Sequence, residues 1–133
     1  MKKINIYEKN ENMNISTDYR GMIADVFNNA DIKRVVLIKS EARVERGKHY
    51  HKKATQYVLV IHGSMELWWN NLYDNSPPKN EFCFEGDLIT LEPYDIHEFV
   101  MNGYGCNTIE FFTENIDTAD YEADSFKVPS LIP

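Results

Sequence analysis

Arg46-Gly47-Lys48-His49-Tyr50-His51-Lys52-Lys53-Ala54-Thr55-Gln56 is the most informative segment of this chain, and it continues through an apolar run to Gly63. It places two histidines on alternate residues and an amide side chain shortly after them. Alternate residues of a β-strand share one face, so we expect His49 and His51 to project together. Histidine changes charge near neutral pH and is the commonest metal ligand. The pair therefore predicts a functional site.

The composition is that of one acidic globular domain. The 133 residues carry a net charge of -7, with 43% hydrophobic and 13% aromatic residues. A chain of this length can bury its own core, and we expect one domain over residues 1–133, with an N-terminal arm over 1–20 and a C-terminal tail over 113–133. The negative charge argues against a broad surface for nucleic acid or anionic membranes.

Basic residues nevertheless gather around the histidine pair. They are Lys33, Lys39, Arg43, Arg46, Lys48, Lys52 and Lys53. A cationic mouth on an acidic protein suits a small anionic ligand such as a phosphate ester, although each of these lysines could equally be a solvated surface charge.

The spacing of the cysteines and the length of the apolar runs indicate the cellular location of the protein. Cys83 and Cys106 are far apart and form no CxxC, which gives no support to a redox or zinc motif. The N-terminus lacks the apolar core of a signal peptide, and no apolar run approaches the ~20 residues that a membrane helix needs. These features predict a soluble protein of the cytoplasm.

Short apolar runs separated by turn residues dominate the chain. The expected strands are 32–39, 56–61, 64–69, 81–85, 87–91, 98–101 and 108–112. A turn at His62-Gly63-Ser64 is expected to join the second and third of these as an antiparallel pair, and Asn102 to Gly105 to interrupt the last two. Residues 117–124 could form a short helix. Many short strands at near-regular spacing predict a sandwich or barrel of antiparallel sheets.

Two groups of residues resemble the sequence motifs of the cupin superfamily. The first is His49-x-His51, Gln56 and Gly63, with glutamine where metal-binding cupins usually have glutamate. The second is Gly86, Pro93, His97 and Asn102. Found together and in this order, they imply an all-β fold, the cupin double-stranded β-helix or jelly-roll barrel.

A narrower resemblance is to the sugar 3,4-ketoisomerases, which act on thymidine-diphosphate-linked 4-keto-6-deoxyhexoses, and to the related 3,5-epimerase cupins. It is carried by Asp18-Tyr19-Arg20-Gly21-Met22-Ile23, by Ile32-Lys33-Arg34-Val35, by the histidine segment and faintly by Asp120-Tyr121. The ketoisomerases have aromatic residues, including an active-site tyrosine, just after the Lys-Arg-Val segment. Here these positions are Val36 and Leu37, so Tyr50 or Tyr94 would have to replace that tyrosine, or the chemistry differs.

The resemblance implies an isomerase or epimerase of a nucleotide-linked ketosugar, active in surface polysaccharide synthesis. His49 and His51 would be catalytic and transfer protons through an enediol without a cofactor, because a C–H beside a ketone is acidic enough for an imidazole base. Arg20 and Arg46 would hold the diphosphate. The full set of expected substrate-binding residues is Arg20, Arg46, Lys52, Gln56, Tyr94 and His97.

Two other functions fit the same residues. The nitrogens of three histidines and the Gln56 oxygen could bind a divalent metal, with His49, His51, Gln56 and His97 as ligands, although a neutral amide is a weaker ligand than a carboxylate. The chain could also be a non-catalytic module that binds a sugar nucleotide. We expect a homodimer, because barrels of this kind commonly cover a hydrophobic sheet with a second copy.

Overall fold

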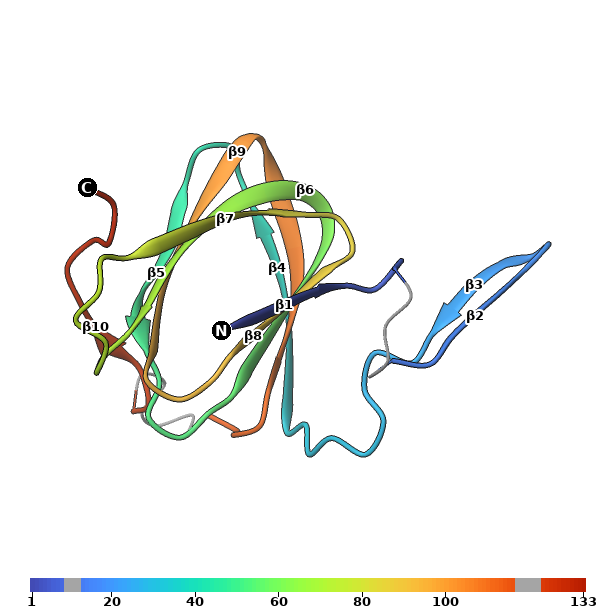
Figure 1. Cartoon of the computed structure of the whole chain (residues 1–133), viewed down its shortest axis with the longest axis horizontal. Coiled ribbons are helices and arrows are strands. Elements are labelled where there is room, and N and C mark those ends of the chain that lie inside the picture. Colours follow the sequence, from blue (N-terminus) through green and yellow to red (C-terminus); the bar gives the residue numbers. More distant parts are fainter. Residues whose placement is uncertain (9–12, 117–122) are drawn as a thin grey trace.

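Antiparallel strands close into a barrel in the computed structural model, which describes residues 1–8, 13–116 and 123–133 (Figure 1). The strands are β1 (Lys2–Asn5), β2 (Ile15–Asp18), β3 (Gly21–Ala24), β4 (Arg34–Ser40), β5 (Glu45–Tyr50), β6 (Gln56–Asn71), β7 (Lys79–Phe84), β8 (Asp87–Leu91), β9 (Asp95–Phe112) and β10 (Phe126–Lys127). The described residues contain no helix, which confirms the all-β prediction. Of the helix suggested for 117–124, residues 117–122 lie outside the described part, and Ala123 and Asp124 form a turn.

Two long strands form the spine of the barrel. β6 pairs with β9 along almost its whole length, from Gln56 opposite Phe112 to Asn71 opposite Asp95. β7 and β8 add to the free edge of β6, while β4 and β5 add to the free edge of β9. Every strand that carries a candidate site residue is therefore anchored to this pair.

The expected turn at His62-Gly63-Ser64 is wrong. β6 continues through it, and the pairing with β9 merely shifts register there. Gly63 and Gly105 both have positive φ, and a Cβ on Gly63 would collide with the Gly105 carbonyl oxygen. Two glycines in close approach let both long strands bend together, so bulges replace the predicted turns.

The barrel interior contains a dry core. It is formed by Val58, Val60, Met65, Leu67, Cys83, Ile89, Leu91, Phe99, Met101 and Cys106, with Trp69 packed against it. A second cluster lies on the other face of β6, where Leu59 and Tyr57 meet the N-terminal residues Met13 and Ile15. The apolar run in β6 is thus largely buried on both sides, while Ile61 at its end is 36% exposed. Cys83 and Cys106 are free and buried.

The β2–β3 hairpin and the C-terminal strand β10 lie on opposite sides of the barrel (Figure 1). Figure 1 shows the β2–β3 hairpin standing away from the barrel, while β10 lies on the far side against β5. Among the described residues there is no helix with the length and hydropathy to cross a membrane.

Candidate active site

A cavity of about 310 Å³ opens beside the dry core, and Phe99 belongs to both. It is lined by Arg34, Val36, Ile38, Arg46, Gly47, His49, His51, Ala54, Gln56, His97, Phe99, Glu110, Phe112, Glu114, Asn115, Ile116, Ala123, Asp124, Ser125 and Lys127. These come from β4, β5, β6, β9 and the C-terminal segment. A volume of this size lies at the lower end of the range for small-molecule sites.

Three histidines meet in this cavity. The ring centroids of His49 and His51 are 4.9 Å apart, and that of His97 lies 4.7 Å from His49 and 5.7 Å from His51. His97 stands directly opposite His49 in the β5–β9 ladder. The expectation that alternate histidines share one face agrees with this arrangement.

A β-bulge brings Arg46 to the same face. Arg46 pairs with Phe99 and His49 with His97, so Lys48 is an extra residue in β5. Gly47 and Lys48 both have positive φ, and a Cβ on Gly47 would contact the backbone of His97. Strict alternation would have turned Arg46 away from the histidines, whereas the bulge re-aims it into the cavity. Its Nε donates to Ser40 Oγ at 2.7 Å.

A chain of hydrogen bonds runs from His51 to a buried carboxyl group. Gln56 Oε1 lies 3.2 Å from His51 Nε2, and Gln56 Nε2 donates to Glu110 Oε2 at 2.8 Å. The other ring nitrogen of His51 lies 2.5 Å from the Asp124 carbonyl oxygen. Both ring nitrogens of His51 therefore face oxygen atoms.

Burial separates the titrations of the groups in the cavity. Desolvation, with smaller effects of His51 and Lys127, lowers the pKa of His49 to about 4. Desolvation also holds the pKa of His97 well below its ordinary value. The same effect raises the pKa of Glu110 to about 7, against the opposing influence of Gln56, Arg34 and Arg46. Neutral imidazoles and a half-neutral carboxyl thus share one site near pH 7.

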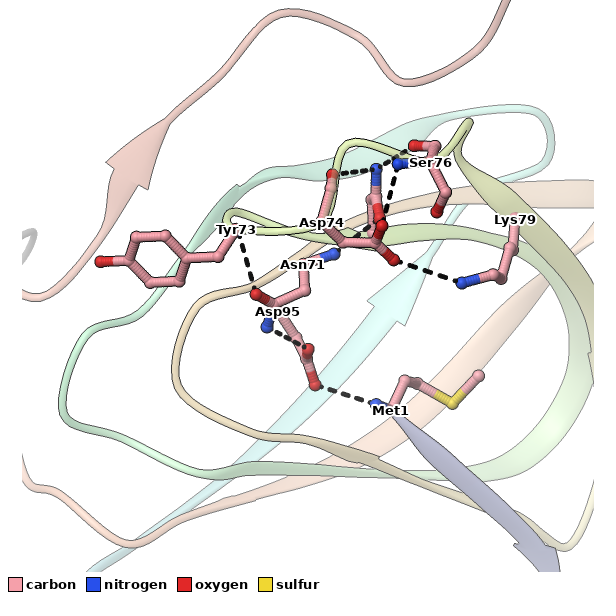
Figure 2. A network of polar contacts seen from close by, with 8 residues as sticks. Met1, Asn71, Tyr73, Asp74, Ser76, Lys79 and Asp95 are labelled. Atoms are coloured by element: carbon pink, nitrogen blue, oxygen red, sulfur yellow. Dashed lines mark hydrogen bonds and ion pairs between the residues drawn. The ribbon is translucent and has the colours of Figure 1, made fainter.

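Backbone contacts fix the third histidine. His97 Nδ1 lies 3.1 Å from the Asp95 carbonyl oxygen and must donate to it, so Nε2 carries the lone pair. That Nε2 is buried and has no hydrogen-bond partner. Asp95 is itself held by Asn71 Nδ2 at 3.1 Å and by the Met1 amino group at 3.1 Å, as Figure 2 shows. This network fixes the start of β9, from which His97 projects.

The C-terminal segment closes one wall of the cavity. The Asp124 carboxylate accepts the backbone N–H groups of Lys52, Lys53 and Ala54 at 2.8–3.2 Å. Beyond it, the fully buried Glu98 carboxylate accepts Ser130 Oγ at 3.0 Å and the Leu131 N–H at 2.8 Å. Without these donors Glu98 would be a poorly compensated buried charge, which ties the segment to the barrel.

The structure gathers most of the candidate residues. His49, His51, Arg46, Gln56 and His97 line the cavity. Three others do not line it. Arg20 is exposed on the β2–β3 hairpin and paired with Asp18 at 2.6 Å, Lys52 lies over the Phe126 ring at 4.2 Å, and Tyr94 packs between Tyr50 and Tyr73.

Sequence reasoning missed Glu110, Arg34 and Asp124 as site residues. Glu110 stands opposite Val36 on β4 and opposite Val58 on β6. A single carboxylate inside the run Thr108 to Phe112, which is otherwise suited to a buried strand, was the available signal. Val36 lines the cavity, and neither Tyr50 nor Tyr94, the two tyrosines expected as replacements for an active-site tyrosine, reaches it.

The three histidines fit a metal ion better than the four-ligand set does. Their donor nitrogens all lie within 4.8 Å of one another. Gln56, expected as the fourth ligand, has its oxygen directed at His51 and its nitrogen at Glu110. A metal here would be bound by three neutral nitrogens, and it would act as a Lewis acid toward a carbonyl oxygen.

No protein-family model matches the chain, and no curated protein does. Solved structures do. The 3,4-ketoisomerase QdtA from Thermoanaerobacterium thermosaccharolyticum, as a variant in complex with TDP, has a TM-score of 0.71 at 22% identity over 96% of this chain and 86% of that one. A 3,4-ketoisomerase from Helicobacter canadensis has a TM-score of 0.73 at 19% identity, covering 96% and 90%. The RmlC epimerase from Mycobacterium tuberculosis has 0.71 at 15%, covering 95% and 67%. The chain has the cupin barrel fold of these sugar-nucleotide proteins.

Proposed function

We propose that this protein is an isomerase or epimerase that moves protons on a nucleotide-linked 4-keto-6-deoxysugar, with no metal required. The observation that carries the proposal is the cavity itself, where a neutral histidine, a doubly hydrogen-bonded histidine and two arginines face one enclosed space. Proteins of the same fold include sugar 3,4-ketoisomerases and an epimerase. The expected role in surface polysaccharide synthesis in the cytoplasm is part of this proposal.

His49 is the base in this mechanism. Moving a ketone from C4 to C3 requires removal of the C3 proton, formation of an enediol and return of a proton to C4. Burial keeps the His49 pKa at about 4, so the ring is neutral and able to accept a proton at pH 7. His51 lies next to it, and an imidazole at this place can stabilise the negative charge that develops on the ketone oxygen.

The arginines bind the diphosphate. Arg46 from β5 and Arg34 from β4 line the cavity, whereas Arg20 does not. A guanidinium group matches two phosphate oxygens at once, which suits it to a diphosphate more than to a free sugar. The cavity lining supports this substrate class, with a ketosugar at the histidines and its diphosphate toward the arginines.

Hydrogen exchange tests the proposal directly. The protein is incubated in heavy water with a thymidine-diphosphate-linked 4-keto-6-deoxyhexose, and deuterium at C3 is followed by NMR. We expect exchange with the wild type and its loss in His49→Asn, with ligand binding retained. His62→Asn, at an exposed histidine outside the cavity, is the matched control and should exchange normally. Normal exchange in His49→Asn would exclude His49 as the base, and binding without any exchange in the wild type would indicate a non-catalytic sugar-binding protein.

A metal-dependent cupin enzyme is the second candidate. It is favoured by the three clustered nitrogens and by the unpartnered lone pair of His97. Elemental analysis of protein purified without chelator separates the two: a bound transition metal in equimolar amount, lost in His97→Gln but kept in His62→Asn, would establish this candidate. Protein free of metal that still catalyses exchange would exclude it.

We also propose a homodimer. Val35 and Leu37 on the outer face of β4 are 60% and 63% exposed, an unusual position for two adjacent large apolar side chains of one strand face. A second copy would cover them. Sedimentation analysis should give a dimer for the wild type and a monomer for Leu37→Glu, while a monomeric wild type would refute the proposal.

A further inference from the structure

Glu110 is a buried ionisable group of the cavity that the mechanism above does not use. It lies on β9 between Val36 and Val58 on the neighbouring strands, and it lines the same cavity as the histidines. Its side chain is almost fully buried. A carboxyl group in such surroundings carries a desolvation cost, so its retention needs a reason other than packing.

The contacts of His51 leave the site without a carrier for the proton that must reach the sugar oxygen. One ring nitrogen of His51 is engaged by the Asp124 carbonyl and the other by Gln56. Neither ring nitrogen of His51 is therefore free to give a proton to the substrate. His97 uses its N–H on the Asp95 carbonyl. Glu110 is a buried carboxyl group of the same cavity, and Gln56 links it to His51.

We propose that Glu110 is a catalytic acid–base residue that shuttles a proton between the two neighbouring oxygens of the ketosugar, while His49 does the same between the two carbons. This inference rests on the proposed function and names a further residue for it. Gln56 holds Glu110 Oε2 by donating to it, which leaves Oε1 to carry the proton. A carboxyl group is suited to this task because it has one donor and one acceptor oxygen side by side.

The steps balance without an oxidant or reductant. His49 takes the C3 proton, the C3–H electrons form the C3–C4 double bond, and the C4 ketone oxygen takes the proton of neutral Glu110, which gives the enediol. The Glu110 carboxylate then takes the proton of the C3 hydroxyl as the C3 ketone forms. The electrons of the C3–C4 double bond take up the proton of the His49 imidazolium at C4. Both residues return to their starting states.

The charged groups around Glu110 keep it poised between its two forms. Arg34 on β4 and Arg46 on β5 favour the carboxylate, as does the hydrogen bond from Gln56, and burial opposes them by a larger amount. The other ionisable groups of the cavity are His49, His51, His97, Glu114, Asp124 and Lys127. The outcome is a pKa of about 7, at which neither proton donation nor proton acceptance is strongly uphill.

The test compares Glu110→Gln with Glu66→Gln, the same substitution at a carboxylate of β6 that does not line the cavity and accepts a hydrogen bond from Asn80. With the thymidine-diphosphate-linked 4-keto-6-deoxyhexose, we expect Glu110→Gln to lower kcat by about 10²- to 10⁴-fold with KM little changed. Glu110→Asp should keep part of the activity, and Glu66→Gln should stay within about twofold of the wild type. The fall of wild-type kcat/KM above pH ~7 should disappear in Glu110→Gln.

A second measurement needs no substrate. Infrared difference spectra of wild type against Glu110→Gln should show the band of a protonated carboxyl that disappears around pH 7. Kinetics of Glu110→Gln equal to those of Glu66→Gln, or a carboxyl that titrates below pH ~5, would overturn the inference while the wild type remains active. Failure of the proposed function is distinguishable, because the wild type itself would then catalyse no exchange, and the inference would fall with it.

Discussion

The apolar core and the cavity are two parts of the barrel interior that are built from the same two strands. They differ in the polarity of the side chains that those strands contribute. Along β9, Phe99, Met101 and Cys106 enter the dry core, while His97 and Glu110 line the cavity. Along β6, Val58, Val60 and Leu67 are core residues, and Gln56 at the start of the strand faces the cavity. The backbone pairing is continuous through both parts. The β6–β9 ladder therefore provides a common frame for both parts. The cavity differs from the core because a few positions near the ends of the ladder carry polar side chains in place of apolar ones.

Removing a core side chain should damage the frame and leave the chemistry intact. Leu67 is 0% exposed, and Leu67→Ala should lower the free energy of unfolding by about 2–5 kcal/mol because it leaves a cavity. Tyr104→Ala, at a 94% exposed position, should change it by less than about 0.5 kcal/mol. Urea titration gives both values. Folded Leu67→Ala with greatly reduced exchange activity would show that core and site are not separable in this way.

The cavity should weaken the fold in acid. Because burial lowers the His49 pKa from 6.5 to about 4, the unfolded chain binds more protons between these values, and stability falls as pH decreases through this window. His49→Asn removes that dependence and should be more stable than the wild type at pH 4 by up to about 3 kcal/mol, with little difference at pH 7. Urea unfolding at several pH values provides the measurement. Parallel pH profiles for the two proteins would contradict it.

Glu110 should weaken the fold at alkaline pH, the opposite of the effect of His49. Its pKa rises from 4.5 to about 7 on folding, so the folded chain binds more protons between these values, and stability falls as pH increases through them. Glu110→Gln should therefore gain up to about 3 kcal/mol over the wild type at pH 8 and almost nothing at pH 4. Glu114→Gln is the control. A destabilised Glu110→Gln at pH 8 would mean that the carboxylate is held by partners strong enough to outweigh its burial.

The C-terminal segment should contribute less to the free energy of unfolding, and its effect on activity should be local to the cavity. Asp124→Ala removes the acceptor of three backbone N–H groups and should cost about 1–2 kcal/mol, together with reduced exchange activity because His51 is less firmly held. Asp74→Ala is a matched control, since Asp74 likewise accepts a backbone N–H, that of Ser76, in the loop of Figure 2. That variant should lose stability but keep full activity. Equal activity in both variants would remove Asp124 from the site.

The sequence predicts the fold and the histidine pair but not the final set of cavity residues. The period-two pattern and the motif order were sufficient for an antiparallel barrel, and alternation alone placed His49 and His51 together. Strict alternation gives the wrong prediction where the backbone departs from regular strand geometry. Gly63 was interpreted as a turn, although it allows a long strand to bend. The extra residue Lys48 brings Arg46 to the same face as the histidines, whereas strict alternation predicts Arg46 on the opposite face. Glu110 depends on contacts between strands distant in sequence.

A last comparison concerns Arg46 and Arg20, the two arginines that the sequence pattern treats alike. Arg46 lines the cavity, and Arg46→Ala should weaken thymidine diphosphate binding by about 10-fold or more, because a lost charge-assisted hydrogen bond costs about 1.5–3 kcal/mol. Arg20 is exposed, paired with Asp18 and carried on a hairpin that stands away from the barrel of its own chain (Figure 1). Arg20→Ala should therefore change binding by less than about twofold when calorimetry is done on the protein as a monomer, such as Leu37→Glu. If Arg20→Ala weakens binding only in the dimeric protein, Arg20 reaches the cavity of a second copy, and the hairpin must be counted as part of the site.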